Sequence, residues 1–386
     1  MQATFDKIQA STLGEGGLPN EVYTSDGFFK WERDHLFASR WFGIGFSADV
    51  PEPGDIHRVD VLGASLLIVR GDDQQIRVFH NVCRHRGRQL LDEPCTRAKL
   101  IRCPYHSWTY RLDGTLSGTP HIGGSGVHTV DNFDKSRFTL YEIAVSTWLD
   151  VVFINLDGQA GPFENFIKPL VKRLERLWGT EGPAGLTPAR DGFTEMEVKS
   201  NWKLAVENYL EAYHLPIVHP VLNRYSPLSQ HYAYHDAADF AGQGVTSYRP
   251  VINGAERLPI LSGWKEELKH TAEYPSVYPN VLIGVQHDHV FTMLLLPLAS
   301  DRTLERVELQ FIDEGATDNA FTDTRSAILE GWRGVFLEDV SAVEGMQYGR
   351  YSQAFDGGVF TPVLDLATRH FHRWYAQHVN AKIEAT

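Results

Sequence analysis

The amino-acid sequence predicts an α+β protein with one all-β domain and one larger domain that mixes strands and helices. Its 386 residues exceed one ordinary domain of about 100–200 residues, so two domains are expected. Residues 41–156 hold short apolar or alternating runs, separated by turns such as PEPGD and LDGT. Residues 157–386 alternate strand-like runs with long helical segments, which is the pattern of an α+β domain.

The first 40 residues contain a helix candidate at 28–39, and we expect this N-terminal segment, 1–40, to pack on the larger domain. In the larger domain we expect a helix at 163–178 and then a loop rich in Gly and Pro at 179–192. The later elements are expected as a strand at 193–198, a helix at 202–213, strands at 280–286, 289–297 and 303–312, and a helix at 322–348.

The composition indicates an ordered protein without a nucleic-acid partner. The formal net charge of −13 is unfavourable for binding phosphates, and no concentration of Lys and Arg offsets it. The N-terminus lacks the basic region and apolar stretch of a secretion signal, and no apolar run reaches about 18 residues, the length of a membrane span. We therefore expect a cytoplasmic protein with no membrane partner.

Cysteine and histidine cluster in the all-β domain. Cys83 and His85 form the motif CRH, and Cys103 and His106 form the motif CPYH after 17 intervening residues. Two Cys and two His are the ligand set of a Rieske [2Fe–2S] cluster, in which two histidines replace two cysteines on one iron. Structural zinc sites use the same residue types, but their spacing is usually longer than the single residue between Cys83 and His85. The third cysteine, Cys95, has no partner at matching spacing and is assigned to the intervening loop.

The segment NWKLAVENYLEAYHLPIVHP predicts a second metal site. On a helix, Glu211 and His214 share one face because they are three residues apart. Pro216 is expected to end that helix, so that His219 returns from the following loop. Two histidines and one carboxylate form the facial triad of iron(II), which leaves positions open for dioxygen and substrate.

The carboxylate of this triad has to come from another part of the larger domain. The helix expected at 322–348 offers Glu338, Asp339 and Glu344, and spacing alone does not choose among them. Most acidic residues on a helix form a solvated face, so two of the three at least are expected to serve no metal.

With both motifs in place, the chain resembles the α subunits of Rieske non-haem iron oxygenases, also called aromatic-ring-hydroxylating oxygenases. The likeness runs from about residue 41 to the C-terminal helix and rests on FHNVCRHRG, CPYHSWTYRLDG, NWKLAVENYLEAYH and EDVSAVEGMQYG. The resemblance implies a [2Fe–2S] cluster on Cys83, His85, Cys103 and His106, a mononuclear iron on His214, His219 and Asp339, and a bridging carboxylate at Glu211.

The resemblance also implies the fold and the partners. The expected fold is an all-β Rieske domain at 41–156 and a helix-grip catalytic domain at 157–386, in a head-to-tail homotrimer. Electrons would come from NAD(P)H through a separate reductase, directly or by way of a ferredoxin, because the sequence has no convincing dinucleotide or flavin motif. The implied function is a terminal oxygenase that uses O₂ to hydroxylate or N-dealkylate a small organic substrate.

Two departures from the usual family pattern bear on the substrate. Glu211 stands where most members have Asp, and Ser107 stands where many have Gly. Both resemble the branch that acts on choline, glycine betaine and carnitine, which favours a quaternary ammonium substrate over an aromatic ring or aromatic acid. Two alternatives from other classes are a plain Rieske electron carrier and a zinc-stabilised binding module. The carrier is disfavoured because such proteins need only the small β domain.

Overall fold

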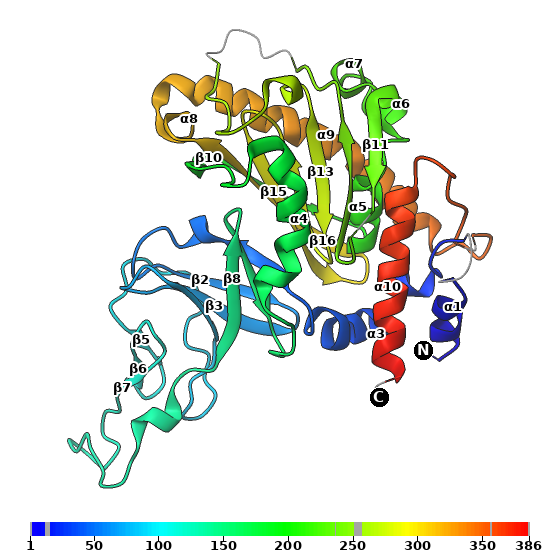
Figure 1. Ribbon diagram of the computed structural model, residues 1–386. Helices are drawn as coiled ribbons and strands as arrows, with labels where there is room; N and C mark the ends of the chain where they lie inside the picture. The colour runs from blue at the N-terminus through cyan, green and yellow to red at the C-terminus, as the bar shows by residue number, and fades with distance from the viewer. Residues whose placement is uncertain (1, 12–15, 236, 251–256, 356, 385–386) are drawn as a thin grey trace. The chain divides into compact units, whose positions relative to one another are not determined.

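The structure, a computed structural model, describes residues 2–11, 16–235, 237–250, 257–355 and 357–384 (Figure 1). The chain divides into two compact units. We call Phe37–Ala160 the β unit, and we call Met1–Leu36 together with Gly161–Thr386 the α+β unit. The corresponding ranges expected from the sequence are 41–156 for the first, and 1–40 with 157–386 for the second.

The β unit contains two antiparallel sheets. The larger one has six strands in the order β1-β9-β8-β4-β3-β2. Its strands are β1 (Phe42–Phe46), β2 (Ile56–Val61), β3 (Ala64–Arg70), β4 (Ile76–His80), β8 (Glu142–Trp148) and β9 (Val151–Asn155). The smaller sheet consists of β5 (Ile101–Arg102), β6 (Thr109–Tyr110) and β7 (Leu116–Gly118). Short 3-10 turns occupy Ser47–Asp49 and Lys135–Phe138.

The core of the β unit includes the two motif cysteines. Cys83 and Cys103 belong to the same buried cluster as Leu67, Phe79 and Tyr110, which come from β3, β4 and β6. Burial of these apolar side chains stabilises the unit and fixes the backbone that carries both cysteines.

The α+β unit is built on a seven-stranded antiparallel sheet with the order β10-β16-β15-β14-β13-β12-β11. Its strands are β10 (Leu186–Val198), β11 (His231–Tyr234), β12 (Phe240–Val245), β13 (Ala272–Val277), β14 (Val281–Val285), β15 (Val290–Ala299) and β16 (Arg302–Ile312). Long helices lie in front of and behind this sheet in Figure 1, which is the arrangement that a helix-grip fold requires.

The helices of this unit range from single turns to 28 residues. The longer ones are α4 (Phe163–Trp178), α5 (Trp202–Tyr209), α9 (Thr322–Gly349), α10 (Leu366–Glu384) and α1 (Gln2–Ser11). The short ones are α2 (Glu21–Thr24), α3 (Asp26–Trp31), α6 (Leu215–Val218), α7 (Leu222–Tyr225) and α8 (Glu314–Thr317). A π-helical turn spans Glu32–Phe37, and 3-10 turns span Leu228–Gln230, Glu266–Leu268 and Asn319–Phe321.

Neighbouring residues of β13 identify which helix covers which face of the sheet. Successive side chains of a strand point to opposite faces. Glu273 forms an ion pair with Arg173 of α4, with 3.0 Å between Oε2 and Nε. The next residue, Tyr274, packs its ring against Trp332 of α9, with 6.1 Å between ring centroids. Helices α4 and α9 therefore cover opposite faces.

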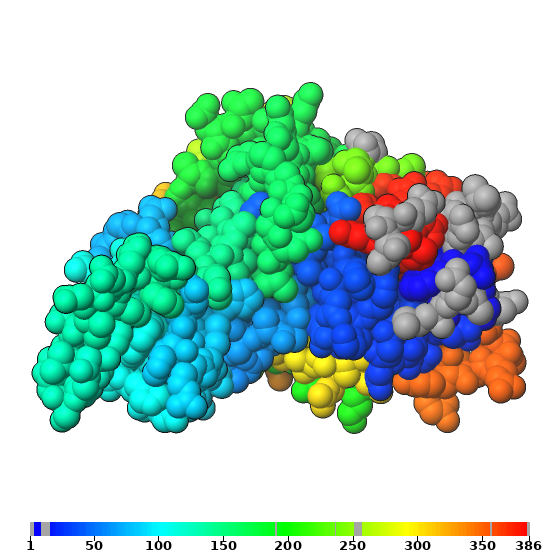
Figure 2. Space-filling model, turned by 90° about the horizontal axis from the view of Figure 1, so that it is seen from below, coloured from blue at the N-terminus to red at the C-terminus, as the bar shows by residue number. Residues whose placement is uncertain are grey.

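The N-terminal segment packs beside the C-terminal helix within the α+β unit. Figure 2 shows the dark-blue N-terminal residues beside the red residues of α10. A buried polar cluster joins the segment to the unit, because the Glu32 carboxylate accepts hydrogen bonds from Lys203 Nζ at 2.7 Å and from the Tyr375 hydroxyl. All three side chains are buried. Helices α5 and α10 are thus tied to the π-helical turn.

Several expected elements are confirmed, and others are corrected. The helices expected at 163–178 and 322–348 match α4 and α9 within one residue. The loop expected at 179–192 is wrong in its second half, because β10 already begins at Leu186 and continues through a bulge after Pro188. The expected helix at 202–213 ends at Tyr209 instead. None of the described helices is long and apolar enough to cross a membrane.

Candidate metal centres

The two motif loops of the β unit share one backbone design. In the first, Cys83 N–H donates to the Arg88 carbonyl at 2.8 Å and Gly87 N–H donates to the Cys83 carbonyl at 3.0 Å. The second repeats this pattern at the same offsets, from Cys103 N–H to the Trp108 carbonyl and from Ser107 N–H to the Cys103 carbonyl. Each loop is therefore a closed turn with the cysteine at its base.

The fifth position of each turn requires a left-handed backbone. Gly87 has a φ of 72° and Ser107 has a φ of 57°. This region costs glycine nothing, whereas a residue with a Cβ loses roughly 1–2 kcal/mol. Ser107 therefore occupies a strained position that many family members fill with Gly, and the rest of the turn has to hold it there.

The four motif side chains converge with the sulfurs inside and the imidazoles outside. Cys83 and Cys103 are buried, and burial together with the neighbouring Cys103 raises the pKa of the Cys83 thiol. The rings of His85 and His106 lie 4.7 Å apart, and the His85 ring is exposed to solvent. Two buried thiols beside two outward imidazoles fit a [2Fe–2S] cluster that takes cysteines on one iron and histidines on the other.

Two aromatic residues orient this set. The Tyr110 hydroxyl accepts the Arg84 backbone N–H at 3.0 Å, which leaves its own hydrogen to point at Cys83 Sγ, 3.3 Å away. Burial raises the pKa of Tyr110, so the hydroxyl stays protonated as a donor. The His85 ring stacks on Trp108 at 4.8 Å with an interplanar angle of 9°. These contacts fix the direction of one sulfur and one imidazole.

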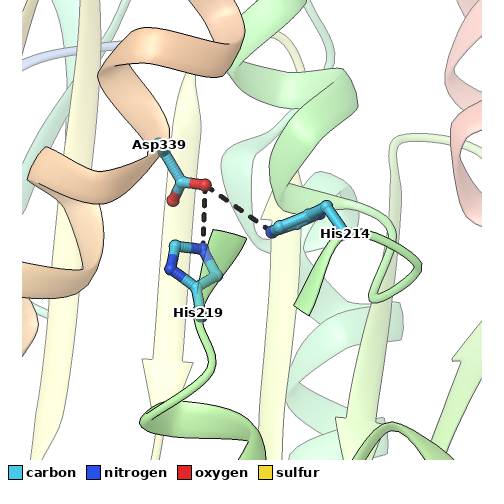
Figure 3. Close-up of side chains that lie close together, drawn as sticks. All are labelled: His214, His219 and Asp339. Carbon is cyan, nitrogen blue, oxygen red and sulfur yellow. Dashed lines mark hydrogen bonds and ion pairs between the residues drawn. The ribbon is translucent and has the colours of Figure 1, made fainter. Parts of the chain in front are cut away.

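In the α+β unit, His214, His219 and Asp339 come together (Figure 3). One potential ligand atom of each lies within 4.8 Å of the others. Asp339 Oδ1 is 2.9 Å from His219 Nε2 and 3.6 Å from His214 Nε2. Two imidazole nitrogens and a carboxylate oxygen at these separations fit the facial triad of one iron(II) ion.

Each histidine of this triad has a glutamate behind it. Glu211 Oε1 lies 2.5 Å from His214 Nδ1, and Glu338 Oε2 lies 2.7 Å from His219 Nδ1. A carboxylate accepts and does not donate, so both Nδ1 atoms carry the hydrogen. Both Nε2 atoms face Asp339, and a neutral ring with its hydrogen on Nδ1 is the tautomer that would bind a metal through Nε2.

The structure distinguishes the three acids that the sequence offered on the late helix. Asp339 reaches the histidines directly, Glu338 contacts only the outer nitrogen of His219, and Glu344 accepts the Lys199 backbone N–H at 3.0 Å. Neighbouring residues of a helix point in different directions, so Glu338 and Asp339 reach His219 from different sides. The separate roles of this pair were missed in the sequence.

The arrangement of Glu211 and His214 differs from the expected single helix. Helix α5 ends at Tyr209, and Glu211 accepts the backbone N–H groups of Tyr213 and His214 with one oxygen. A side chain that captures nearby backbone donors competes with helix formation. Pro216 lies inside α6, near its first turn, and does not end a helix as expected.

A cavity of about 470 Å³ opens beside the triad. Its lining is mainly aromatic and apolar, with a small polar corner. The described residues that line it are Asn208, Tyr209, His214, Leu215, His219, Leu222, Ser226, His231, Gln243, Tyr274, Trp332, Val335, Phe336 and Asp339. Among these residues none is Lys or Arg, and the single acid is Asp339.

The polar side chains of this corner form hydrogen bonds with one another and with nearby backbone carbonyls. Gln243 Nε2 donates to the carbonyls of Tyr209 at 2.9 Å and Glu211 at 3.2 Å, so its Oε1 faces His231 Nδ1 at 3.0 Å. His231 Nδ1 therefore carries the hydrogen, and its Nε2 accepts from the Ser226 hydroxyl. Burial lowers the pKa of His231, which keeps the ring neutral. The sequence offered no signal for this corner, because its residues come from three separate elements.

A second cavity, of about 340 Å³, shares Asn208, Tyr209, Phe336 and Asp339 with the first. Its lining includes Glu305 on β16, which is 6% exposed. Burial and the charge of Asp339 raise the pKa of Glu305 to about 8. Glu305 also was missed in the sequence, where it is one of several polar residues of the strand expected at 303–312.

Comparison with protein families identifies both units. A model of the Rieske [2Fe-2S] domain matches residues 40–133, and a model of the ring hydroxylating alpha subunit (catalytic domain) matches residues 187–381. The second match alone covers half of the chain. The two matches together exclude the two alternatives from other classes, a plain Rieske electron carrier and a zinc-stabilised binding module.

Individual relatives share most of their length with the chain. The carnitine monooxygenase oxygenase subunit of Acinetobacter baumannii is 28% identical over 349 residues, covering 88% of this chain and 86% of the relative. The glycine betaine monooxygenase oxygenase subunit of Chromohalobacter salexigens is 24% identical over 422 residues, covering 99% and 90%. The structure of naphthalene 1,2-dioxygenase from Rhodococcus sp. bound to indole superposes with a TM-score of 0.78 at 20% identity, over 98% of both chains.

These matches confirm the expected α+β fold of a Rieske domain with a ring-hydroxylating catalytic domain. They also confirm the expected cofactors, a Rieske [2Fe–2S] cluster and a mononuclear iron, and an oxidoreductase activity that depends on a reductase. The chain belongs to the ring-hydroxylating α-subunit family and is the oxygenase subunit of a multicomponent Rieske oxygenase.

Proposed function

We propose that the substrate of this oxygenase is a quaternary ammonium compound, which is hydroxylated at a carbon next to the charged nitrogen. The balanced reaction consumes O₂, NAD(P)H and one proton, places one oxygen atom in the substrate and releases the other as water. The bond between nitrogen and the hydroxylated carbon then breaks with its electron pair going to nitrogen, which gives an aldehyde, a tertiary amine and the proton lost from the hydroxyl group. The relatives named for carnitine and glycine betaine support this substrate class.

The charge of the cavity is the observation that carries the proposal. Its described lining has an aromatic wall of Tyr274, Trp332 and Phe336 and no Lys or Arg. A quaternary ammonium ion over such a face gains about 0.5–2 kcal/mol from cation–π attraction. An aromatic acid carries only a carboxylate, which no cation of the described lining would pair, whereas the carboxylate of glycine betaine or carnitine accompanies an ammonium group that the aromatic wall attracts. The cavity therefore favours a cation over an anion.

We propose that the motif residues hold the two metal centres. Cys83, His85, Cys103 and His106 would hold the cluster, and His214, His219 and Asp339 would hold the mononuclear iron. When bound, the cluster supplies electrons singly and the iron activates dioxygen. Glu211 and Glu338 keep the Nδ1 hydrogens of the triad histidines in place. The aromatic wall shields the reacting carbon from bulk water.

We further propose a homotrimer in which Glu211 links the two centres of neighbouring subunits. The support is exposure around this residue: in the isolated chain Tyr213 is 57% exposed and Ile217 is 85% exposed. Large apolar side chains that stand free beside a functional residue are typical of a surface that a partner covers. The exposed His85 ring gives the cluster a face toward another subunit. Sedimentation of Ile217→Asp beside the wild type tests the assembly: a monomeric wild type would contradict the trimer, and a variant that stays trimeric would contradict an interface beside Glu211.

The proposed substrate class is tested with the reconstituted holoenzyme and a surrogate reductase. Choline, glycine betaine and carnitine are compared with benzoate and salicylate, and NADH consumption is measured together with aldehyde formation. We expect a quaternary ammonium compound to give coupled turnover, with about one aldehyde per NADH by the reaction's stoichiometry. Coupled turnover of an aromatic acid, with none of the three cations active, would contradict the proposal and favour aromatic hydroxylation.

A further inference from the structure

A buried hydrogen-bonded chain stands behind the aromatic wall of the substrate cavity. Trp332 Nε1 lies 2.8 Å from His289 Nε2, and His289 Nδ1 lies 2.7 Å from Asp288 Oδ1. Trp332 and His289 are buried, and the Asp288 side chain is 16% exposed. None of these contacts involves the residues proposed to hold iron.

The hydrogen positions in this chain follow from the groups themselves. An indole nitrogen only donates, so His289 Nε2 has to accept and carries no hydrogen. The neutral ring then has its hydrogen on Nδ1, which donates to the Asp288 carboxylate. Burial alone would raise the pKa of Asp288, but the hydrogen bond from His289 and the neighbouring histidine side chains outweigh burial and lower it. Asp288 is therefore an anion that fixes the tautomer of His289.

The chain joins a turn of the sheet to α9, the helix that carries Trp332 into the lining of the cavity. Asp288 and His289 lie in the turn between β14 and β15, where Gln286 N–H donates to the His289 carbonyl at 3.0 Å. Trp332 lies on α9, and Asp339 follows seven residues later on the same helix. Seven residues are about two helical turns, so both side chains leave the same face. The bond to His289 thus ties this face of α9 to the sheet.

The hydrogen bond between Trp332 and His289 also determines which part of the indole lines the cavity. Trp332 packs against other rings, with 4.6 Å to Phe291 and 5.9 Å to Phe336 between centroids. Its one polar atom is taken up by His289, so only carbon surface is left to line the cavity. A π surface attracts a cation, whereas a free N–H would be a donor for an anion.

We propose that Asp288 and His289 are positioning residues that set the preference for a cationic substrate, because they hold the Trp332 indole with its N–H turned toward His289, so that no donor of this ring faces the substrate. The inference rests on the proposed quaternary ammonium substrate and adds residues that do not touch that substrate. Removal of the acceptor at His289 frees the indole N–H and loosens the ring. The cavity then loses part of its preference for a positive charge.

The test measures charge preference directly with a matched pair of ligands. Choline and 3,3-dimethylbutan-1-ol have the same shape, but only choline carries a charge. Their Kd values for the holoenzyme are measured by calorimetry, and the ratio of the two is compared among variants. We expect the wild type to favour choline by about tenfold, the size of a well-formed cation–π contact. In His289→Leu we expect the ratio to fall to about two or less.

Two variants separate positioning from general damage. His289→Gln keeps an acceptor near the Nε2 position and is expected to retain a ratio within about twofold of the wild type. His287→Leu changes a histidine of the same turn, 3.8 Å from Asp288, and is expected to leave the ratio unchanged. If His289→Leu fails to fold, Trp332→Phe provides the same comparison, because it keeps a ring but removes the N–H.

The outcomes distinguish this inference from the proposed function. A wild-type ratio near one would overturn the substrate class and this inference with it. A high wild-type ratio that stays high in His289→Leu and in Trp332→Phe would overturn the positioning role alone. Equal weakening of both ligands in His289→Leu, with the ratio preserved, would also overturn it, because a merely structural role predicts that result.

Discussion

The cluster loops of the β unit and the triad of the α+β unit both gather metal-binding side chains, but they do so by different routes. The four cluster residues lie between Cys83 and His106, on two turns with the same hydrogen-bond pattern. The triad joins His219 to Asp339 across 120 residues of sequence. Local turns make the first set robust, whereas the second depends on how α9 packs on the sheet.

Removal of the distant carboxylate should produce the largest effect. In Asp339→Ala we expect loss of the mononuclear iron and a fall in turnover of about 10³-fold or more, because two histidines alone hold iron(II) poorly. The visible spectrum of the cluster should be unchanged. Iron analysis and turnover of Glu344→Gln provide the control, since Glu344 lies on the same helix and contacts only a backbone amide. Equal loss in both variants would contradict the assignment.

A substitution in the buried polar cluster of Glu32, Lys203 and Tyr375 tests how far the triad depends on packing. Lys203 is fully buried against Glu32, and Lys203→Met leaves that carboxylate without its cation. We expect the α+β unit to lose about 3–5 kcal/mol of unfolding free energy. Urea unfolding followed by tryptophan fluorescence and by cluster absorbance should show the change mainly in the first signal. An equal loss of unfolding free energy in both signals would contradict the account, in which the triad depends on packing of the α+β unit and the cluster loops do not.

Glu211, which lies behind His214, allows the triad to be tested without removing a proposed iron ligand. In Glu211→Gln we expect both metals to remain bound and turnover to fall about 100-fold, because Glu211 is proposed to link the two centres of neighbouring subunits as well as to support His214. Glu338→Gln should instead weaken iron binding by about tenfold, because Glu338 supports only His219. Single-turnover oxidation of the cluster separates the two. Normal turnover of Glu211→Gln would remove its proposed role.

The smallest effect is expected in the cluster loops themselves. Gly87→Ala places a Cβ at a φ of 72°, in open space, so only backbone strain of about 1 kcal/mol is expected. Ser107→Gly should change stability by less than this and in the favourable direction, because it relieves the same strain. Bleaching of the cluster in urea measures both. A larger loss from Ser107→Gly would show that the hydroxyl, and not the backbone, matters there.

The sequence predicted a cluster set whose side chains lie close together in the structure, because the information for it is local. Cys83, His85, Cys103 and His106 stand at fixed offsets within two turns, and no distant contact is needed to recognise them. The bounds of α9 were also predicted, because its apolar residues repeat with the helical period. In both cases a short stretch of chain carries its own signal.

Spacing did not choose between Asp339 and Glu338; the family resemblance alone singled out Asp339, and the geometry that separates the two acids comes from the packing of α9 on the sheet. The end of α5 at Tyr209 was missed because Glu211 captures two backbone N–H groups, a contact that competes with helix formation. The chain from Asp288 to Trp332 was missed because it joins a turn to a helix 43 residues away. The unpredicted parts of the site are thus those made by tertiary contacts.

Metal content with electron paramagnetic resonance tests the central claim most directly. The reconstituted wild type should contain about three irons and two labile sulfides per chain, and show a Rieske signal after reduction. Asp339→Ala should lose about one of the irons and keep the signal unchanged. About two irons in the wild type, with no further loss in Asp339→Ala, would contradict a second iron site at His214, His219 and Asp339.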